Sequence, residues 1–324
     1  QKFLEFIKNK MKKKVIIISI KGIKLTTKEK QLIKNERPWG LILFNRNVKS
    51  IFQLKKLTQE IRRISKDKKF PILIDEEGGK VSRLRGIIQH KATQKLFGDI
   101  FNISSKISLK IYKDYINSLC LILKKIGANI NTVPVLDVLQ KKTNKIIGHR
   151  SFSKNPLIVR KLGEACIKNY KVNKIANVIK HIPGHGCASS DSHINTPKVK
   201  DKFSKLNKSD FFPFKSISSH FAMTAHVLYL KIDKENVATF SKKIIKKIIR
   251  KKLKFRGILI SDDISMKALK FDLVTNAKKS LLAGCNLVLY CAGNYKDTIK
   301  LIKSVPYIDA FTRKKTSEFY KFLG

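Results

Sequence analysis

The amino-acid sequence predicts an α/β fold, a single-domain (β/α)8 barrel of the TIM type. Short apolar runs rich in Val, Ile and Leu alternate with longer amphipathic stretches, which is typical of parallel strands covered by helices. The chain has 324 residues, a length that fits one large barrel, and no linker rich in Pro, Gly or Ser divides it. Polar residues follow several of the apolar runs directly, where barrels of this kind carry their catalytic groups.

Eight apolar runs are the predicted strands. Because they are apolar almost without interruption, we expect them to be buried on both faces. They comprise residues 15–20, 39–44, 70–75, 129–138, 177–182, 222–229, 257–261 and 286–291.

Eight helices are predicted between and after these strands. Ser50 and Ser241 are candidate N-caps, and Gly127 and Gly284 stand just past two helix ends. The helices comprise residues 27–34, 50–64, 108–126, 156–173, 207–218, 241–253, 273–283 and 295–304.

The N-terminal region and the cysteines bear on where the protein acts. Met11 lies in a lysine cluster, so we expect a catalytic domain over residues 11–324 and an N-terminal extension over residues 1–10. The apolar run 15–20 is too short for a signal peptide, and no stretch approaches the ~18 apolar residues that span a bilayer.

The five cysteines are odd in number and form no C-x-x-C pair, which fits a reducing compartment. We expect a cytoplasmic monomer that does not insert into a membrane.

The net charge of +47 raises the alternative of a nucleic-acid-binding protein. The lysines, however, are spread over almost every predicted helix and form no single stripe interleaved with aromatic residues. Lys, Ile and Asn are all abundant, as AT-rich codons would produce. We therefore interpret the charge as compositional and expect no specific nucleic-acid partner.

Two adjacent acids, Asp262 and Asp263, end the seventh predicted strand. Neighbouring strand residues point in opposite directions, so one carboxylate can face the barrel mouth while the other caps the next helix. A carboxylate held at the mouth could act as a nucleophile, a base or a metal ligand. The alternative is that both acids only cap the helix.

The third predicted strand ends in Asp75, within the stretch DEEGGKVSR. A short carboxylate there accepts hydrogen bonds well from vicinal hydroxyl groups. The pair Gly78-Gly79 allows a tight turn beside a ligand, and Arg83 could return to the same pocket as a donor. The alternative is a solvated turn.

The stretch KHIPGHGCASSDSH gathers three of the seven histidines of the chain. Lys180 and His181 end the fifth predicted strand, and a small, flexible run follows. Asp191 and His193 then stand two residues apart, so in extended chain their side chains point the same way. One carboxylate oxygen can bond the imidazole and raise its basicity, which suits proton transfer near neutral pH.

Two alternatives apply to this stretch. It could be a surface loop with incidental histidines, or it could hold a zinc ion in a metal-dependent barrel hydrolase. The spacing differs from the H-E-x-x-H pattern, and the first strand lacks the His-x-His of such hydrolases. The candidate metal ligands would be His181, His185, Asp191 and His193.

Six segments resemble, in order and spacing, the β-N-acetylglucosaminidases of glycoside hydrolase family 3, of the NagZ type that acts in peptidoglycan recycling. The resemblance runs from about residue 15 to beyond residue 291, and the histidine-rich block distinguishes these enzymes from the β-glucosidases of the family. The segments are LIDEEGGKVSRL, PVLDV, IGHRSF, KHIPGHGCASSDSH, AMTAHVLY and ISDDISM.

The resemblance implies a role for each matching residue. Asp262 corresponds to the nucleophile, His193 to the general acid/base and Asp191 to the partner of that histidine. The positions that bind the N-acetylglucosamine correspond to Asp75, Arg83, Arg150, Lys180 and His181.

His149 departs from the family pattern, which usually has Asp before this arginine, and so the positioning of Arg150 is in question. His185 receives no role.

The implied reaction is a retaining double displacement without metal or cofactor. Its substrate would be a terminal β-linked N-acetylglucosamine of peptidoglycan fragments, namely N-acetylglucosaminyl-1,6-anhydro-N-acetylmuramic acid with or without peptide.

Overall fold

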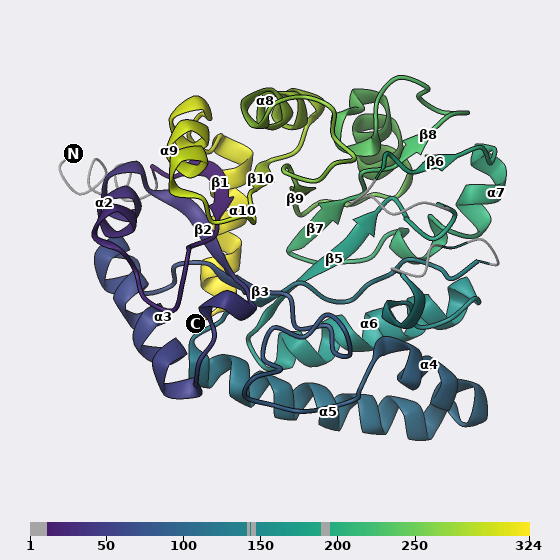
Figure 1. Ribbon diagram of the computed structural model, residues 1–324. Coiled ribbons are helices and arrows are strands. Elements are labelled where there is room, and N and C mark those ends of the chain that lie inside the picture. Colours follow the sequence, from purple (N-terminus) through teal and green to yellow (C-terminus); the bar gives the residue numbers. More distant parts are fainter. Residues whose placement is uncertain (1–11, 141–142, 144–146, 189–194) are drawn as a thin grey trace.

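Eight parallel strands close into a barrel in the order β1-β10-β9-β7-β5-β4-β3-β2, and helices surround it (Figure 1). This computed structural model describes residues 12–140, 143, 147–188 and 195–324. The barrel strands are β1 Lys14–Ile18, β2 Pro38–Leu43, β3 Ile72–Ile74, β4 Ile130–Asn131, β5 Ala176–Ile182, β7 Phe221–Thr224, β9 Ile258–Asp263 and β10 Leu287–Leu289. The predicted (β/α)8 fold is therefore confirmed.

The strands are apolar because both of their faces are covered. All residues of β2, β3 and β5 are buried. Leu41 and Leu43 of β2 belong to one buried apolar cluster together with Leu54 of the adjacent helix, and Ile42 belongs to a second with Leu73 of β3. Burial on both faces is what the continuous apolar runs predict.

Six of the predicted helices form close to their predicted bounds. They are α2 Thr27–Glu36, α3 Ile51–Ser65, α5 Ser105–Ile126, α6 Pro156–Val172, α8 Leu273–Ala283 and α9 Tyr295–Ser304. Ser50 Oγ accepts a hydrogen bond from the N–H of Gln53, and Gly127 ends α5 with φ 80°, so the predicted cap residues act as expected.

The helix predicted over residues 207–218 is wrong. The chain instead forms a short α7 at Phe203–Lys208 and a 3-10 turn at Phe212–Phe214. Pro213 has no N–H for a continuing helix, and Ser216 has φ 56°, which a right-handed helix does not allow.

Two predicted strands are shorter than expected. The run 129–138 forms a continuous strand only over β4. Beyond Pro134, which lacks an N–H for a ladder, it meets β5 again in a single bridge between Val135 and Lys180. The run 222–229 divides into β7 and β8 Leu228–Tyr229, which pairs with β6 Lys198–Val199 in a separate two-stranded sheet. The helix predicted over residues 241–253 is a π-helix at Ile244–Lys252, where Ser241 Oγ accepts from the N–H of Ile244.

The sequence analysis missed α4 Gln94–Ile103 and α10 Ala310–Phe322. Phe319 of α10 contacts Phe221 at the start of β7 with a ring separation of 5.2 Å and Trp39 of β2 at 6.4 Å. Trp39 Nε1 also donates to Thr316 Oγ1 of α10 at 2.9 Å. Helix α10 therefore covers the barrel at the amino ends of its strands and leaves the opposite end for ligands.

Among the described residues, every helix is too short or too polar to cross a lipid bilayer.

Candidate active site

A cavity of about 270 Å³ opens at the carboxyl ends of the barrel strands. Six of the eight predicted site residues line it: Asp75, Arg83, Arg150, Lys180, His181 and Asp262. The other two, Asp191 and His193, lie outside the described residues. The chain between Ile182 and Ala188, which leads toward them, contributes His185 to the cavity wall.

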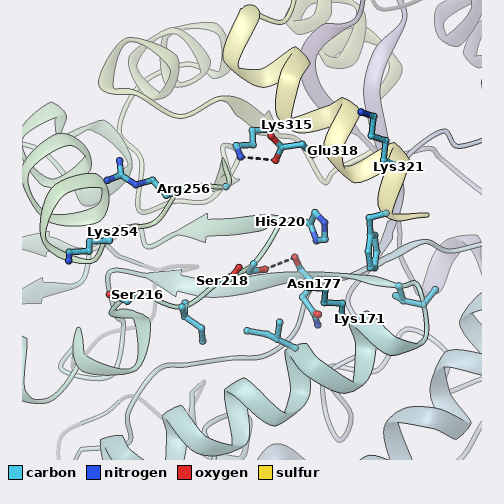
Figure 2. Close-up of a pocket in the computed structure, with 16 residues that line it drawn as sticks. Lys171, Asn177, Ser216, Ser218, His220, Lys254, Arg256, Lys315, Glu318 and Lys321 are labelled. Carbon is cyan, nitrogen blue, oxygen red and sulfur yellow. Dashed lines mark hydrogen bonds and ion pairs between the residues drawn. The ribbon is translucent and has the colours of Figure 1, made fainter. Parts of the chain in front are cut away.

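A second hollow of about 600 Å³ lies at the opposite end of the barrel (Figure 2). Asn177, His220 and Gly257, at or just before the starts of β5, β7 and β9, line it. Among its lining residues the one carboxylate, Glu318, is paired with Lys315 at 2.7 Å. It has no free acid for nucleophilic or acid/base chemistry, so the smaller cavity is the candidate active site.

Asp75 follows β3 and sits among positive charges. It accepts hydrogen bonds from Arg83 Nη2 at 2.9 Å, from Lys180 Nζ at 3.1 Å and from the hydroxyl of Thr132. Burial alone would raise the pKa of Asp75, but the charges of Lys180 and Arg83 outweigh it and hold the pKa well below its usual value. Asp75 is thus a fixed, ionised acceptor at the cavity wall.

Glu77 is a buried site residue that the sequence analysis did not single out. Arg150 binds it through Nε at 2.7 Å and Nη2 at 2.9 Å, and Lys180 Nζ approaches it to 2.5 Å. Burial opposes ionisation of Glu77, but Arg150 and Lys180 outweigh it and lower its pKa to about 2. The signal was available, because Glu77 stands two residues after Asp75 and so on the same side of extended chain.

The position of Arg150, which the unusual His149 put in question, is set by this two-pronged contact with Glu77. His149 itself is exposed, in the turn Gly148–Arg150. An arginine held by both oxygens of a buried carboxylate needs no acid before it in the sequence.

Asp137 orients His181, and the sequence analysis missed it although it quoted the motif PVLDV. His181 Nδ1 donates to Asp137 Oδ2 at 2.6 Å, and the N–H groups of His181 and His185 donate to Oδ1 at 3.2 and 2.8 Å. Burial would raise the pKa of Asp137, but His181 outweighs it and lowers the pKa, so the carboxylate is the acceptor. The other ring nitrogen, Nε2, then faces Asp262 Oδ2 at 4.0 Å.

The two acids at the end of β9 point to different partners, as the sequence analysis expected. Asp263 accepts from the N–H and hydroxyl of Ser265 at 3.1 and 2.8 Å and from the N–H of Cys291 at 3.3 Å. Asp262 lines the cavity. Burial would raise the pKa of Asp262, but the nearby charge of His181 outweighs it and lowers the pKa, which keeps this carboxylate ionised.

His185 lines the cavity as a neutral imidazole. Burial lowers its pKa to about 4, and its Nδ1 has no hydrogen-bond partner among the described residues. Its ring meets that of His181 at a centroid distance of 5.9 Å.

Among the residues that the structure describes, this arrangement offers one available ionised carboxylate, Asp262, beside charged donors and acceptors suited to hydroxyl groups. In the part of the chain that the structure describes, no group of three His, Cys, Asp or Glu side chains is arranged to hold a metal ion. Two of the four candidate metal ligands, Asp191 and His193, lie outside that part.

Comparisons with known proteins agree with this geometry. Residues 7–311 match the model of the glycosyl hydrolase family 3 N terminal domain. A beta-hexosaminidase of Nitrosomonas eutropha is 33% identical over 281 residues, which cover 85% of this chain and 80% of that protein. Two crystal structures of NagZ from Neisseria gonorrhoeae are also similar. The native structure is 29% identical with a TM-score of 0.86, covering 95% of this chain and 90% of that one.

The structure of that protein in complex with N-trifluoroacetyl-D-glucosamine is 28% identical with a TM-score of 0.85, covering 97% of this chain and 90% of that one. The match to the family model spans most of the chain, and the curated relative exceeds 30% identity over most of both proteins. The chain therefore belongs to glycoside hydrolase family 3, as a glycoside hydrolase of the beta-hexosaminidase kind.

Proposed function

We propose that this hydrolase is a retaining exo-β-N-acetylglucosaminidase that acts on peptidoglycan fragments. Its substrate is N-acetylglucosaminyl-1,6-anhydro-N-acetylmuramic acid, with or without peptide. The observation that carries the proposal is Asp262, an ionised carboxylate that faces the cavity while its neighbour Asp263 is engaged in hydrogen bonds.

In the first step, a carboxylate oxygen of Asp262 attacks the anomeric carbon of the terminal sugar. The bond to the leaving sugar breaks as His193 gives its proton to the departing oxygen. In the second step, water attacks the same carbon and gives a proton to His193, and Asp262 leaves as a carboxylate. Asp191 orients His193 in both steps.

The remaining residues of the cavity hold the sugar. Asp75 accepts from sugar hydroxyl groups, and Arg83, Arg150 and Lys180 donate to them. His181, oriented by Asp137, presents Nε2 beside Asp262. Each charged partner of a hydroxyl group contributes roughly 1.5–3 kcal/mol to binding.

The size of the cavity supports cleavage at a chain end. At about 270 Å³ it lies at the small end of ligand pockets, which run from ~300 to 1,000 Å³. Such a volume suits one sugar ring with its acetamido group, and the rest of the substrate would extend out of the barrel mouth.

We further propose that the catalytic domain comprises residues 11–324 and acts in the cytoplasm as a monomer. All five cysteines are free, which supports a reducing compartment. Size-exclusion chromatography with light scattering tests the monomer.

Release of a chromophore from an aryl β-N-acetylglucosaminide, compared with the matching β-glucoside, tests the activity. We expect strong preference for the N-acetylglucosaminide and release of N-acetylglucosamine from the natural disaccharide. Equal rates on both glycosides would contradict the proposal. Loss of activity with a chelator, restored by zinc, would favour the alternative of a metal-dependent hydrolase.

A further inference from the structure

Asp210 is a buried carboxylate that the proposed reaction does not use. It follows α7, has no exposed surface and lies against the segment that leads to His193. Its Oδ1 accepts from the N–H of Gly186 at 3.0 Å, and its Oδ2 accepts from the N–H of Cys187 at 3.2 Å. Hydrogen bonds to a charged acceptor are strong, and their loss leaves buried donors unpaired, so Asp210 fixes this backbone.

The two glycines of the motif Pro-Gly-His-Gly leave room for Asp210 and, at Gly186, also for the backbone of Val138. A Cβ atom at Gly184 would lie 2.7 Å from Asp210 Cγ, and one at Gly186 would lie 2.7 Å from Asp210 Oδ1. Gly184 also has φ 149°, which favours glycine. A larger residue at Gly184 would push the carboxylate away from the backbone that it binds. One at Gly186 would also collide with the carbonyl of Val138.

Neighbouring contacts hold the same stretch. The hydroxyl of Tyr229 donates to the carbonyl of Gly184, and Asp137 Oδ1 accepts from the N–H of His185 at 2.8 Å. Together with the two bonds of Asp210, each of residues 184–187 has one backbone N–H or carbonyl group that is hydrogen-bonded to a side chain.

We propose that Asp210 is a positioning residue for the acid/base segment. Through the N–H groups of Gly186 and Cys187, its ionised carboxylate fixes the start of the segment that carries Asp191 and His193. This inference rests on the proposed function, because it gives Asp210 an indirect part in the proton transfers of His193. A displacement of about 1 Å at a catalytic group can cost ~100-fold in rate.

The strength of the hydrogen bonds that Asp210 accepts from the backbone depends on pH. Burial and the nearby charge of Asp137 raise the pKa of Asp210 to about 7, against the opposing bonds from Cys187 and Gly186. Within the described chain, the other titratable groups that face it are the thiol of Cys187 and the hydroxyl of Tyr229, and burial raises the pKa of both. Both stay neutral near pH 7, so the proton that matters is that of Asp210. Asp210 is half ionised near pH 7, so its two backbone bonds gain a charged acceptor as the pH rises through 7 and lose it as the pH falls.

The test compares Asp210→Asn with the control Asp201→Asn. Asn keeps the shape of Asp210 but offers one acceptor oxygen in place of two. Asp201 lies before α7, where it pairs with Lys205 at 2.6 Å, and no hydrogen bond joins it to the described residues 184–188. The readouts are amide hydrogen exchange over residues 184–188 and hydrolysis of aryl β-N-acetylglucosaminides with a range of leaving groups.

In Asp210→Asn we expect the amides of Gly186 and Cys187 to exchange about tenfold faster, the equivalent of one lost charged hydrogen bond. The rate loss should reach ~100-fold for poor leaving groups and be small for activated phenols, with inhibition by N-acetylglucosamine unchanged. The ratio of wild-type to Asp210→Asn rates should shrink as the pH falls through 7, because only the wild type loses a charge there. Asp201→Asn should behave as the wild type.

Unchanged exchange in Asp210→Asn would overturn the inference. An equal rate loss for every leaving group would also overturn it, because Asp210 would then only support the fold. If Asp210→Asn does not fold, Asp210→Glu decides. It keeps the charge but displaces the oxygens, so it must also show faster exchange of these amides and the same dependence on the leaving group. A wild type that cleaves no N-acetylglucosaminide would refute the proposed function, while the exchange data would still report on the anchor.

Discussion

At the scale of single residues, the site depends on carboxylates that have the same chemistry but different surroundings. Asp262 and Asp263 are adjacent, yet Asp263 is satisfied by Ser265 and Cys291, and burial raises its pKa. The charge of His181 overcomes the burial of Asp262 and lowers its pKa. The pair therefore divides into one structural acid and one acid that is available for chemistry.

For His193 we predict a loss that depends on the leaving group. His193→Ala should harm substrates with poor leaving groups most, because a sugar alkoxide needs a proton as it departs and an activated phenolate does not. General acid/base assistance is worth about 10²- to 10⁴-fold, and Asp191→Ala should show a milder form of the same pattern. Rates for a series of aryl β-N-acetylglucosaminides measure this. A uniform deficit would make His193 a binding residue.

Glu77→Gln should destabilise the protein by about 3–5 kcal/mol near pH 7, because Arg150 and Lys180 lose their buried partner. The pKa of Glu77 is about 2, below its ordinary value of 4.5, so its contribution is fully present above pH 4.5 and lost as the pH falls toward 2. Urea unfolding at several pH values should show the difference between wild type and variant shrinking over that range.

The control for this prediction is Glu164→Gln. Glu164 is about half exposed and pairs with Arg160 at 2.9 Å on the surface, so its loss should cost less than about 1 kcal/mol. A difference between wild type and Glu77→Gln that stays constant down to pH 2 would refute the assigned charge of Glu77.

At the scale of elements, one end of the barrel carries the active site and the other end is covered for stability. The carboxyl ends of the strands carry the site, and α10 covers the amino ends through Phe319.

Phe319→Ala should lower the free energy of unfolding by about 3–5 kcal/mol, while kcat at 25 °C stays near that of the wild type. Phe311→Ala, at an exposed position of the same helix, is the control. Chemical denaturation and an aryl glycoside assay measure both effects. A stable but inactive Phe319→Ala would contradict this division.

The elements also show what the sequence could and could not predict. Continuous apolar runs reveal buried parallel strands, and the position of Asp75 and Asp262 at strand ends follows from them. The position of Glu77 two residues after Asp75 was a visible signal, but the partners that bury Glu77 and Asp137 lie far away in the sequence, so their role as anchors could not be predicted. Pro213 was visible and should have broken the helix predicted across it.

At the scale of the whole molecule, the charge of +47 should not take part in catalysis. Surface lysines act on the site over distances at which salt screens them, since the Debye length is about 10 Å at 0.1 M. We predict that kcat on a neutral aryl glycoside changes little between low and high salt. A steep fall of kcat with salt would mean that the basic surface contributes to the reaction.

The central claim is that the cavity carries out a double displacement through Asp262. The most direct measurement is to trap the glycosyl-enzyme with a slowly hydrolysed fluorinated N-acetylglucosaminide and to locate the label by peptide mass spectrometry. We predict one sugar per chain, attached to Asp262, and no label in Asp262→Ala. A label on Asp263 or on another residue, or turnover without any covalent species, would contradict the account.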